Sequence, residues 1–559
     1  MLFYFFGFII LIAAVLAFNR IYTKRKTERL ISYFKHAWGK PQNQTYYNFD
    51  LIDRYFLNKI ESAAAGCFQL VSDKLAEDLY LDNVFKAIDL TISKIGQQYL
   101  YFKIRVVEKK LGNLMKFDSL VNEFQTDEAL RIKCQLSLHK LSKLGSYYYE
   151  DLIHGITIEK PKYFSLIYLL SLVSFGSLIA SFFYPQVLLT FFGIFAVNAL
   201  LHYWNKKNLS LHLSSLIEYS SVYSTGTDLN KQPVLRSYCE DQSFFQELHA
   251  LNKKMRFINL ISVVENDPTS IGFLASELFK IAFNLEIIVF YNVIGDINDK
   301  TAALGKLFIF IGEIDSALSV ASFRTSAPQF CKPNFLSPKH LKVKDLVHPL
   351  IESCTPNSLL LDNQSLLLTG SNMSGKTTFI RSIAINLLLG QTIYTCLASE
   401  FNAPFSRIFS SINIADNLLN NTSCYLEEVI TLKDFIDESI DTEPALFILD
   451  ELFKGTNTLE RIANGKAVLS SLNQNDHLVL VSTHDVELCD LLYPSFNLYH
   501  FSESIIDSEL VFDHKIKEGR LRTSNAIRLL EANGFPESII SDAYSTYDAL
   551  KVNHISTSG

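Results

Sequence analysis

The pattern of hydrophobic and polar positions divides the chain into three kinds of segment. From Lys342 onward, short apolar runs alternate with helical stretches, which is typical of an α/β domain with a largely parallel sheet. Residues 209–324 carry the pattern of long helices and contain few Gly or Pro. Three further runs are apolar almost throughout, namely Leu2–Phe18, Tyr163–Phe183 and Val187–Tyr203. The pattern therefore predicts a C-terminal α/β domain preceded by helices, some of which are apolar enough to cross a membrane.

The first apolar run, Leu2–Phe18, is about as long as the shortest membrane-spanning helices. Basic residues follow it between Arg20 and Lys26, whereas a secretory signal carries its positive charge before the apolar stretch. We expect an uncleaved anchor at residues 1–26 with its C-terminal side in the cytoplasm, because cytoplasmic flanks of membrane helices are rich in Lys and Arg. A cleaved signal peptide is the alternative.

The second and third apolar runs are separated only by Tyr184-Pro185-Gln186. Lysines flank the pair on both outer sides, so both flanks favour the cytoplasm. Residues 161–207 are expected to form a transmembrane hairpin with a short outer turn, and two buried helices of a soluble domain are the alternative. With the first run, this predicts a multi-pass protein of the inner cell membrane, with three crossings and the bulk of the chain in the cytoplasm.

A fourth apolar stretch, Phe273–Ile294, is interpreted differently. Glu277, Lys280 and Glu286 interrupt it, and charged side chains at membrane depth are costly. We expect a core helix here. Tyr99–Arg105 mixes aromatic and basic residues and could contact nucleic acid, although the edge of a core helix is the more ordinary interpretation.

One loop carries the pattern G-x-x-x-x-G-K-S/T between an expected strand and an expected helix. In such a loop, backbone N–H groups surround a phosphate, and the following helix directs its positive N-terminal end at the same phosphate. Lys376 can reach the β- and γ-phosphates, and the Thr377 hydroxyl can ligate Mg²⁺. The expected phosphate-binding residues are Gly370, Ser371, Asn372, Met373, Ser374, Gly375, Lys376, Thr377 and Thr378.

Two later strands end in residues that a nucleotide site needs. The apolar run from Ala445 ends in Asp450, which can hold Mg²⁺, and Glu451, which can polarise an attacking water. The run from Leu478 ends at His484, which could sense the γ-phosphate. A histidine that only caps its strand is the alternative for His484.

Residues from about Val347 to Ala543 resemble the ATPase domain of the MutS family of DNA mismatch-repair proteins, an ABC-class fold. The segments that carry the resemblance are Thr369–Thr378 with its Asn372-Met373 pair, Phe405–Asp416, Thr422–Glu427, Leu449–Asn457 and Ser482–His484. Near the end, Ser524–Ile527 and Gly534–Ala543 resemble the helix-turn-helix that packs the family's ATPase dimer. Ile88–Arg105 and Ser322–Pro333 are similar to the two ends of the family's core helical domain.

The resemblance implies ATP and Mg²⁺ as ligands, with Thr377 and Asp450 at the metal. It implies Glu451 as the catalytic base, His484 as the γ-phosphate sensor and Lys376 as a catalytic phosphate ligand. Thr422 and Ser423 would face the nucleotide of the partner subunit, which implies a homodimer. No mismatch-reading domain is expected, because the apolar anchor stands where the family has that domain.

The expected fold is an α/β ABC-class P-loop ATPase domain at the C-terminus, preceded by an all-α core and lever domain and by transmembrane helices. The expected limits are 1–26 for the anchor, 27–160 and 208–338 for the helical core and levers, 161–207 for the hairpin and 339–559 for the ATPase domain.

Charge and cysteine usage leave two functions open. The net charge of -7 does not indicate a strongly basic nucleic-acid binder, although it allows a local basic face. The eight scattered cysteines favour a reducing compartment over disulfides or zinc. One function is a membrane-anchored MutS-like ATPase whose dimer closes on DNA when ATP binds. The other is an ATP-switched membrane scaffold that acts on a protein partner without DNA.

Overall fold

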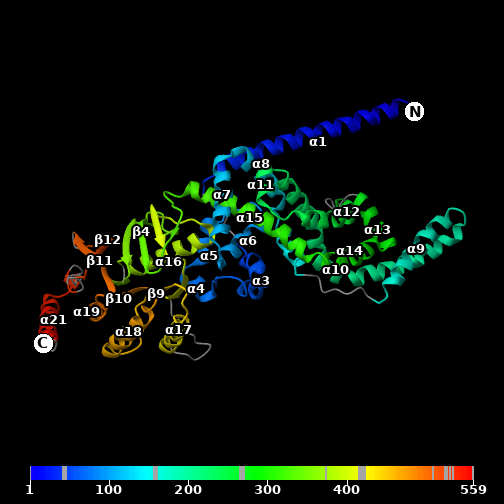
Figure 1. The fold of residues 1–559 in the computed structure, drawn as a ribbon. Coiled ribbons are helices and arrows are strands. Elements are labelled where there is room, and N and C mark those ends of the chain that lie inside the picture. Colours follow the sequence, from blue (N-terminus) through cyan, green and yellow to red (C-terminus); the bar gives the residue numbers. More distant parts are fainter. Residues whose placement is uncertain are drawn as a thin grey trace. The chain divides into compact units, whose positions relative to one another are not determined.

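The computed structural model describes residues 2–40, 47–154, 162–263, 271–371, 374–412, 424–506, 509–521, 527, 530–531 and 534–556. The chain divides into two compact units (Figure 1). The helical unit comprises Met1–Ser62, Ile88–Lys103 and Lys116–Ser326, and the sheet unit comprises Ala63–Ala87, Ile104–Met115 and Ala327–Gly559. Two N-terminal segments therefore group with the C-terminal sheets.

The first part of the chain is almost entirely helical. Its elements are α1 (Leu2–Ala37), α2 (Phe49–Ile52), α3 (Arg54–Ala64), α4 (Asp73–Asp78), α5 (Leu81–Ile88), α6 (Lys94–Arg105), α7 (Leu111–Thr126), α8 (Glu128–Leu138), η1 (His139–Leu141), η2 (Leu144–Leu152), α9 (Phe164–Ser181), η3 (Pro185–Val187), α10 (Leu188–Asn230), α11 (Pro233–Tyr238), α12 (Ser243–Val263), α13 (Ile271–Ala282), α14 (Leu285–Asn298) and α15 (Thr301–Ser326). The fully buried Asp315 of α15 accepts hydrogen bonds from the amides of Ile92 (3.0 Å) and Ser93 (2.7 Å) and so fixes the segment just before α6. Burial raises the pKa of this carboxyl to about 6.

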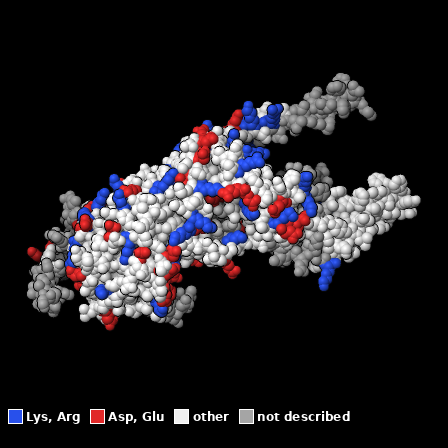
Figure 2. Space-filling model, viewed as in Figure 1, with Lys and Arg blue, Asp and Glu red and all other residues white. Residues whose placement is uncertain are grey.

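Two helical segments among the described residues are long and apolar enough to cross a membrane, Phe164–Ser181 and Pro185–Asn205. Only 17% and 11% of these segments are buried in the protein, so neither has the burial of a soluble core helix. On the face that Figure 2 shows, the outer part of this hairpin carries no charged side chains. The structure thus supports two candidate spans, where the sequence pattern predicted three. The first predicted span lies within α1, and the side chains of residues 2–16 are not among those described.

The apolar stretch from Phe273 to Ile294 is not the single helix that the sequence pattern predicted. It forms α13 and α14 with a break at Phe283 and Asn284, and Asn284 adopts a left-handed conformation with φ of 49°. No Gly or Pro marks the break in the sequence, which is why the periodicity did not reveal it.

The described part of the sheet unit contains a six-stranded, a four-stranded and a two-stranded sheet. Its remaining elements are β1 (Gln69–Leu70), β2 (Val106–Val107), β3 (Asn334–Phe335), β4 (His340–Leu346), β5 (Asn357–Asp362), β6 (Ser365–Thr369), α16 (Lys376–Ile393), β7 (Glu400–Ala403), β8 (Arg407–Ser411), α17 (Cys424–Glu438), β9 (Ala445–Asp450), α18 (Thr458–Leu472), β10 (Leu478–Thr483), α19 (Glu487–Leu492), β11 (Phe496–Ile506), β12 (Glu509–Glu518) and α21 (Glu537–Ser556). The large sheet has the order β12-β11-β6-β10-β9-β8, in which only β12 runs antiparallel to its neighbour. The four-stranded sheet has the order β3-β7-β4-β5, and the two-stranded sheet is formed by β1 and β2.

The strand register places the functional loops together. β10 lies between β6 and β9, with Thr483 opposite Thr369 and Ser482 opposite Asp450. The strands β6 and β10 are buried along their whole length, as expected for central parallel strands. The loops that leave the carboxyl ends of β6, β9 and β10 therefore share one edge of the sheet, where ligands bind in open α/β sheets.

Candidate nucleotide site

The loop after β6, here called the phosphate loop (Gly370–Thr378), needs its two glycines for geometric reasons. Gly370 has a φ of 146°, and a Cβ added there would lie 2.8 Å from the carbonyl oxygen of Phe501. Gly375 has a φ of 107°, which side chains rarely allow. The Ser374 hydroxyl donates to the Ser371 carbonyl at 2.7 Å and tightens the turn. The predicted residues Asn372 and Met373 lie outside the described residues.

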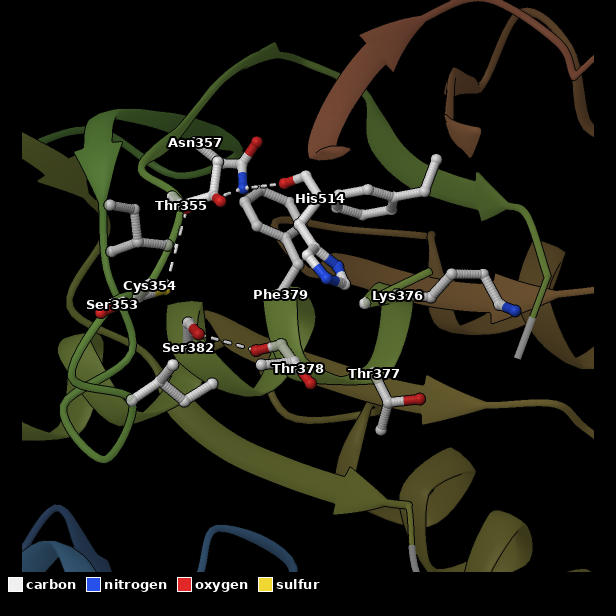
Figure 3. Close-up of a pocket in the computed structure, with 14 residues that line it drawn as sticks. Ser353, Cys354, Thr355, Asn357, Lys376, Thr377, Thr378, Phe379, Ser382 and His514 are labelled. Atoms are coloured by element: carbon white, nitrogen blue, oxygen red, sulfur yellow. Dashed lines mark hydrogen bonds between the residues drawn. The ribbon is translucent and has the colours of Figure 1, made fainter. Parts of the chain in front are cut away.

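A pocket of about 500 Å³ opens beside the phosphate loop, over the start of α16 (Figure 3). Its lining includes Lys376, Thr377 and Thr378 from the loop, together with Ile351, Phe379 and His514. Nδ1 of His514 lies 3.0 Å from the Ser374 carbonyl oxygen, so this ring is in contact with the loop backbone.

The pocket contains residues that the sequence analysis missed. Asn357 of β5 donates to the His514 carbonyl at 2.9 Å and accepts from the Ile516 amide at 2.8 Å, which ties β5 to β12 above the loop. None of these three residues belongs to a recognisable motif. His514 comes from the antiparallel edge strand, and only the three-dimensional pairing brings it to the loop.

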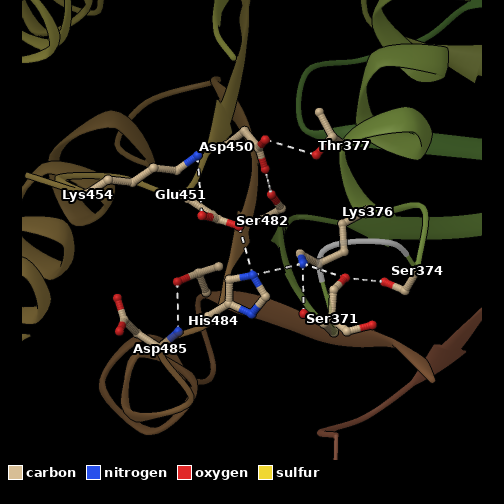
Figure 4. Close-up of polar contacts among 12 residues, drawn as sticks. Ser371, Ser374, Lys376, Thr377, Asp450, Glu451, Lys454, Ser482, His484 and Asp485 are labelled. Atoms are coloured by element: carbon tan, nitrogen blue, oxygen red, sulfur yellow. Dashed lines mark hydrogen bonds and ion pairs between the residues drawn. The ribbon is translucent and has the colours of Figure 1, made fainter. Parts of the chain in front are cut away.

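Lys376 is buried inside the phosphate loop, with 2% of its surface exposed. Its Nζ donates to the carbonyl oxygens of Gly370 at 2.7 Å and Ser371 at 2.9 Å, and it lies 3.3 Å from Nε2 of His484 (Figure 4). Burial lowers the pKa of Lys376, and the nearby carboxylates of Glu451 and Asp450 oppose that shift. The structure therefore holds a cation where the loop would receive a phosphate.

Asp450 and Thr377 are in direct contact. The Thr377 hydroxyl donates to one carboxylate oxygen of Asp450 at 2.9 Å, and the Ser482 hydroxyl donates to the other. Hydroxyl and carboxylate oxygens are the donors that Mg²⁺ prefers beside phosphates. Among the described residues no group of three or more His, Cys, Asp or Glu forms a self-sufficient metal cluster. The donor set fits a Mg²⁺ ion that shares its coordination with a nucleotide.

Glu451 lies directly after β9 in a left-handed conformation, with φ of 55°. Its Oε1 is 2.8 Å from Nε2 of His484, and its Oε2 is 3.3 Å from Nζ of Lys454. The hydrogen bond with His484, supported by the charge of Lys454, lowers the pKa of Glu451 to about 2. The carboxylate is therefore ionised at neutral pH. The structure brings together five of the predicted residues, namely Lys376, Thr377, Asp450, Glu451 and His484.

Helix α17 packs on the loop that carries Glu451. The buried Glu428 accepts a hydrogen bond from the Phe453 amide, and the Tyr425 ring lies 6.2 Å from the Phe453 ring. The sequence analysis did not single out Glu428. The predicted residues Thr422 and Ser423, just before α17, lie outside the described residues, as do Ser524, Asn525 and Ala526.

The comparison with protein families agrees with this geometry. The family model described as MutS domain V matches residues 366–551, which include the phosphate loop, the Asp450-Glu451 pair and His484. The C-terminal part of the chain is thus similar to MutS domain V. The MutS domain V is a P-loop ATPase domain, so the predicted C-terminal ATPase fold is confirmed.

Curated relatives extend the MutS match beyond domain V. The DNA mismatch repair proteins MutS of Staphylococcus aureus strains JH9, Newman and Mu3 / ATCC 700698 are each 30% identical to this chain over 274 residues. The aligned region is 47% of this chain but 31% of each relative. The chain thus spans about a third of the length of the curated MutS proteins that it matches.

Proposed function

We propose that this MutS-like chain binds and hydrolyses ATP at the phosphate loop. The observation that carries the proposal is the convergence of Lys376, Glu451 and His484 at the carboxyl ends of three parallel strands. A phosphate-binding loop, an acidic pair and a histidine in this arrangement match the needs of phosphoryl transfer to water.

Each residue of the site has its own role in ATP binding or hydrolysis. Lys376 and the loop amides bind the β- and γ-phosphates, and Thr377 with Asp450 holds Mg²⁺. When bound, Mg²⁺ neutralises charge on the phosphate oxygens. The ionised Glu451 orients the attacking water and accepts its proton, while His484 holds the Glu451 carboxylate and lies near the γ-phosphate position. The pocket lined by Ile351 and His514 receives the nucleoside, since its volume of about 500 Å³ suits a small ligand.

A binding measurement tests the phosphate loop. Lys376→Ala should abolish binding of a fluorescent ATP analogue to the detergent-solubilised full chain, because it removes the cation from the loop. Lys466→Ala, an exposed lysine on α18, is the matched control and should bind normally. Equal affinity of both variants would overturn the assignment of the nucleotide site.

We further propose that the α9–α10 hairpin lies in the inner cell membrane and that the bulk of the chain is cytoplasmic. The sequence from Tyr163 to Asn205 contains no Asp, Glu, Lys or Arg. Large apolar side chains are exposed along both helices, among them Leu172 at 72% and Leu189 at 81%. Such a surface is unfavourable in water and suits lipid. The first apolar run, within α1, remains a predicted third span. Retention of the chain in the membrane pellet after carbonate extraction supports the proposal, and release into the supernatant contradicts it.

By analogy with the relatives, which are named DNA mismatch repair proteins, we propose that a homodimer closes on DNA when ATP binds and reopens on hydrolysis. DNA should then stimulate the ATPase rate, and the stimulation should fade as salt rises, because phosphate contacts depend on counterion release. Fluorescence anisotropy without detectable binding to duplex, branched or single-stranded DNA at low salt would contradict this function.

One observation favours the second candidate, an ATP-switched membrane scaffold for a protein partner. On the face that Figure 2 shows, Lys and Arg are interspersed with Asp and Glu, and the net charge is -7. A DNA-binding surface is usually a continuous basic patch. An ATPase rate that no DNA form changes would favour the scaffold, whereas strong DNA stimulation would exclude it.

A further inference from the structure

The break between α13 and α14 is held by side chains of the α9–α10 hairpin. A helix break frees backbone carbonyl groups, which need other hydrogen-bond donors. The Ala282 carbonyl accepts hydrogen bonds from the Ser174 hydroxyl and from the side-chain amide of Asn198, both at 2.8 Å. The Phe283 carbonyl accepts from the Ser171 hydroxyl at 2.7 Å. Three hairpin side chains thus satisfy the two carbonyls beside the break.

Further polar contacts extend from the break along α14. The fully buried Asn284 donates through Nδ2 to Oδ1 of Asn198 at 2.7 Å. One turn after Asn198 on α10, Nδ1 of the buried His202 lies 3.8 Å from Oε2 of Glu286. An aromatic contact accompanies these bonds: the ring centroids of Phe283 and Phe175 lie 5.9 Å apart. The two broken helices and the hairpin therefore form one packed group with polar contacts at its centre.

The break lies level with the middle of the hairpin. Ser171 and Ser174 are near the centre of the candidate span Phe164–Ser181, and Asn198 is inside the span Pro185–Asn205. Exposed apolar residues continue toward the hairpin base, with Leu166 at 50% and Trp204 at 66%. A bilayer that covers the hairpin from its tip to its base therefore also surrounds the break.

The charges that argued against membrane depth are paired inside this group. Lys280 is 3% exposed and lies 3.2 Å from Glu277, and Glu286 faces His202. Between these charges, Leu278 and Phe279 expose 50% and 56% of their surface. Polar side chains and irregular backbone are tolerated at membrane depth when they are satisfied within the protein, while apolar side chains face lipid.

We propose that α13 and α14 enter the membrane beside the hairpin as a broken helix, with Leu278 and Phe279 in contact with lipid acyl chains. This inference rests on the proposed membrane position of the hairpin. It replaces the expectation of a core helix at Phe273–Ile294, and it places α9, α10, α13 and α14 together in the membrane around a polar centre.

Thiol accessibility tests the proposal on the full chain in open membrane fragments. Leu278→Cys and Phe279→Cys change side chains at an exposed surface, so neither disturbs the core. Each is treated with a water-soluble maleimide, and labelling at the substituted position is read by peptide mass, before and after SDS. Leu172→Cys on the hairpin and Leu144→Cys, which is 68% exposed on η2, are the two controls.

The proposal predicts about tenfold less labelling before SDS at positions 278, 279 and 172 than at 144, because thiols in hydrocarbon are shielded from an aqueous reagent. Labelling of Leu278→Cys and Phe279→Cys at the rate of Leu144→Cys, with Leu172→Cys still protected, would overturn the inference and leave the membrane hairpin intact. Fast labelling of Leu172→Cys as well would overturn the membrane position of the hairpin itself.

Discussion

The carboxylate of Glu428 accepts a hydrogen bond from the backbone amide of Phe453 at 2.5 Å. Glu428 lies on α17 with 4% of its surface exposed, and burial raises its pKa. Phe453 follows Glu451 by two residues, and both have left-handed backbone conformations. A Cβ added at Gly455 would lie 3.1 Å from Cβ of Tyr425, so α17 also approaches the far side of this loop closely. The position of Glu451 therefore depends on α17.

Removing this acceptor should slow hydrolysis more than it weakens binding. Glu428→Leu leaves the buried Phe453 amide unsatisfied, which costs about 1–3 kcal/mol, and lets the Glu451 loop shift. We expect a lower kcat with a nearly unchanged KM for ATP. Glu428→Gln keeps an oxygen acceptor and should restore most of kcat. If both variants turn over ATP like the parent chain, α17 does not position Glu451.

A methyl group at Gly370 should disable the phosphate loop. Gly370→Ala places a Cβ 2.8 Å from the Phe501 carbonyl oxygen on a backbone with φ of 146°, so the loop must distort. We expect at least about a tenfold loss of ATP affinity, which corresponds to about 1.4 kcal/mol. Gly112→Ala meets no atom within 4 Å and is the matched control, with unchanged affinity. Normal ATP binding by Gly370→Ala would contradict the loop geometry.

The lowered pKa of Glu451 makes a prediction about acid stability. Its folded-state pKa of about 2 is below the ordinary value of 4.5, so the ionised carboxylate stabilises the fold above pH 4.5. This contribution is lost as pH falls from 4.5 toward 2. In urea unfolding, the difference in free energy between the parent chain and Glu451→Gln should be constant above pH 4.5 and shift against the parent below it. A pH-independent difference would exclude the hydrogen bond with His484 as the source of the shift.

The polar contacts at the α13–α14 break should contribute to stability in detergent. Asn198→Leu removes a donor to the Ala282 carbonyl and the acceptor for Asn284. We expect a loss of about 1–2 kcal/mol, seen as a lower Tm of the helical unit. Leu200→Ala, at a position 74% exposed on the same helix, should leave Tm nearly unchanged. A Tm of Asn198→Leu equal to that of the parent would show that these contacts do not hold the break.

The phosphate loop and the acidic pair were predictable because their signals are local. Gly370 and Lys376 stand at fixed spacing in one short segment, and Asp450 ends an apolar strand. Because neighbouring parallel strands end at the same edge of a sheet, these two local signals were enough to place the residues together. His514 could not be predicted, because an antiparallel strand far along the chain brings it to Ser374.

The region from α9 to α14 illustrates what the sequence pattern could not predict. The charges at Glu277 and Lys280 argued against a membrane helix, because a sequence does not show that Lys280 is buried and paired with Glu277. Asn284 breaks the helix without Gly or Pro, and its partners on the hairpin are distant in sequence. Local pattern therefore predicted the apolar stretch but not the break or its environment.

The most direct test of the central claim compares ATP binding and single-turnover hydrolysis of the full chain with those of Glu451→Gln. The account predicts that the variant binds ATP as the parent does, because Lys376, Thr377 and Asp450 remain, and that hydrolysis falls at least about a hundredfold, because the water loses its base. Normal hydrolysis by Glu451→Gln would contradict the assignment of Glu451 as the base that activates the attacking water.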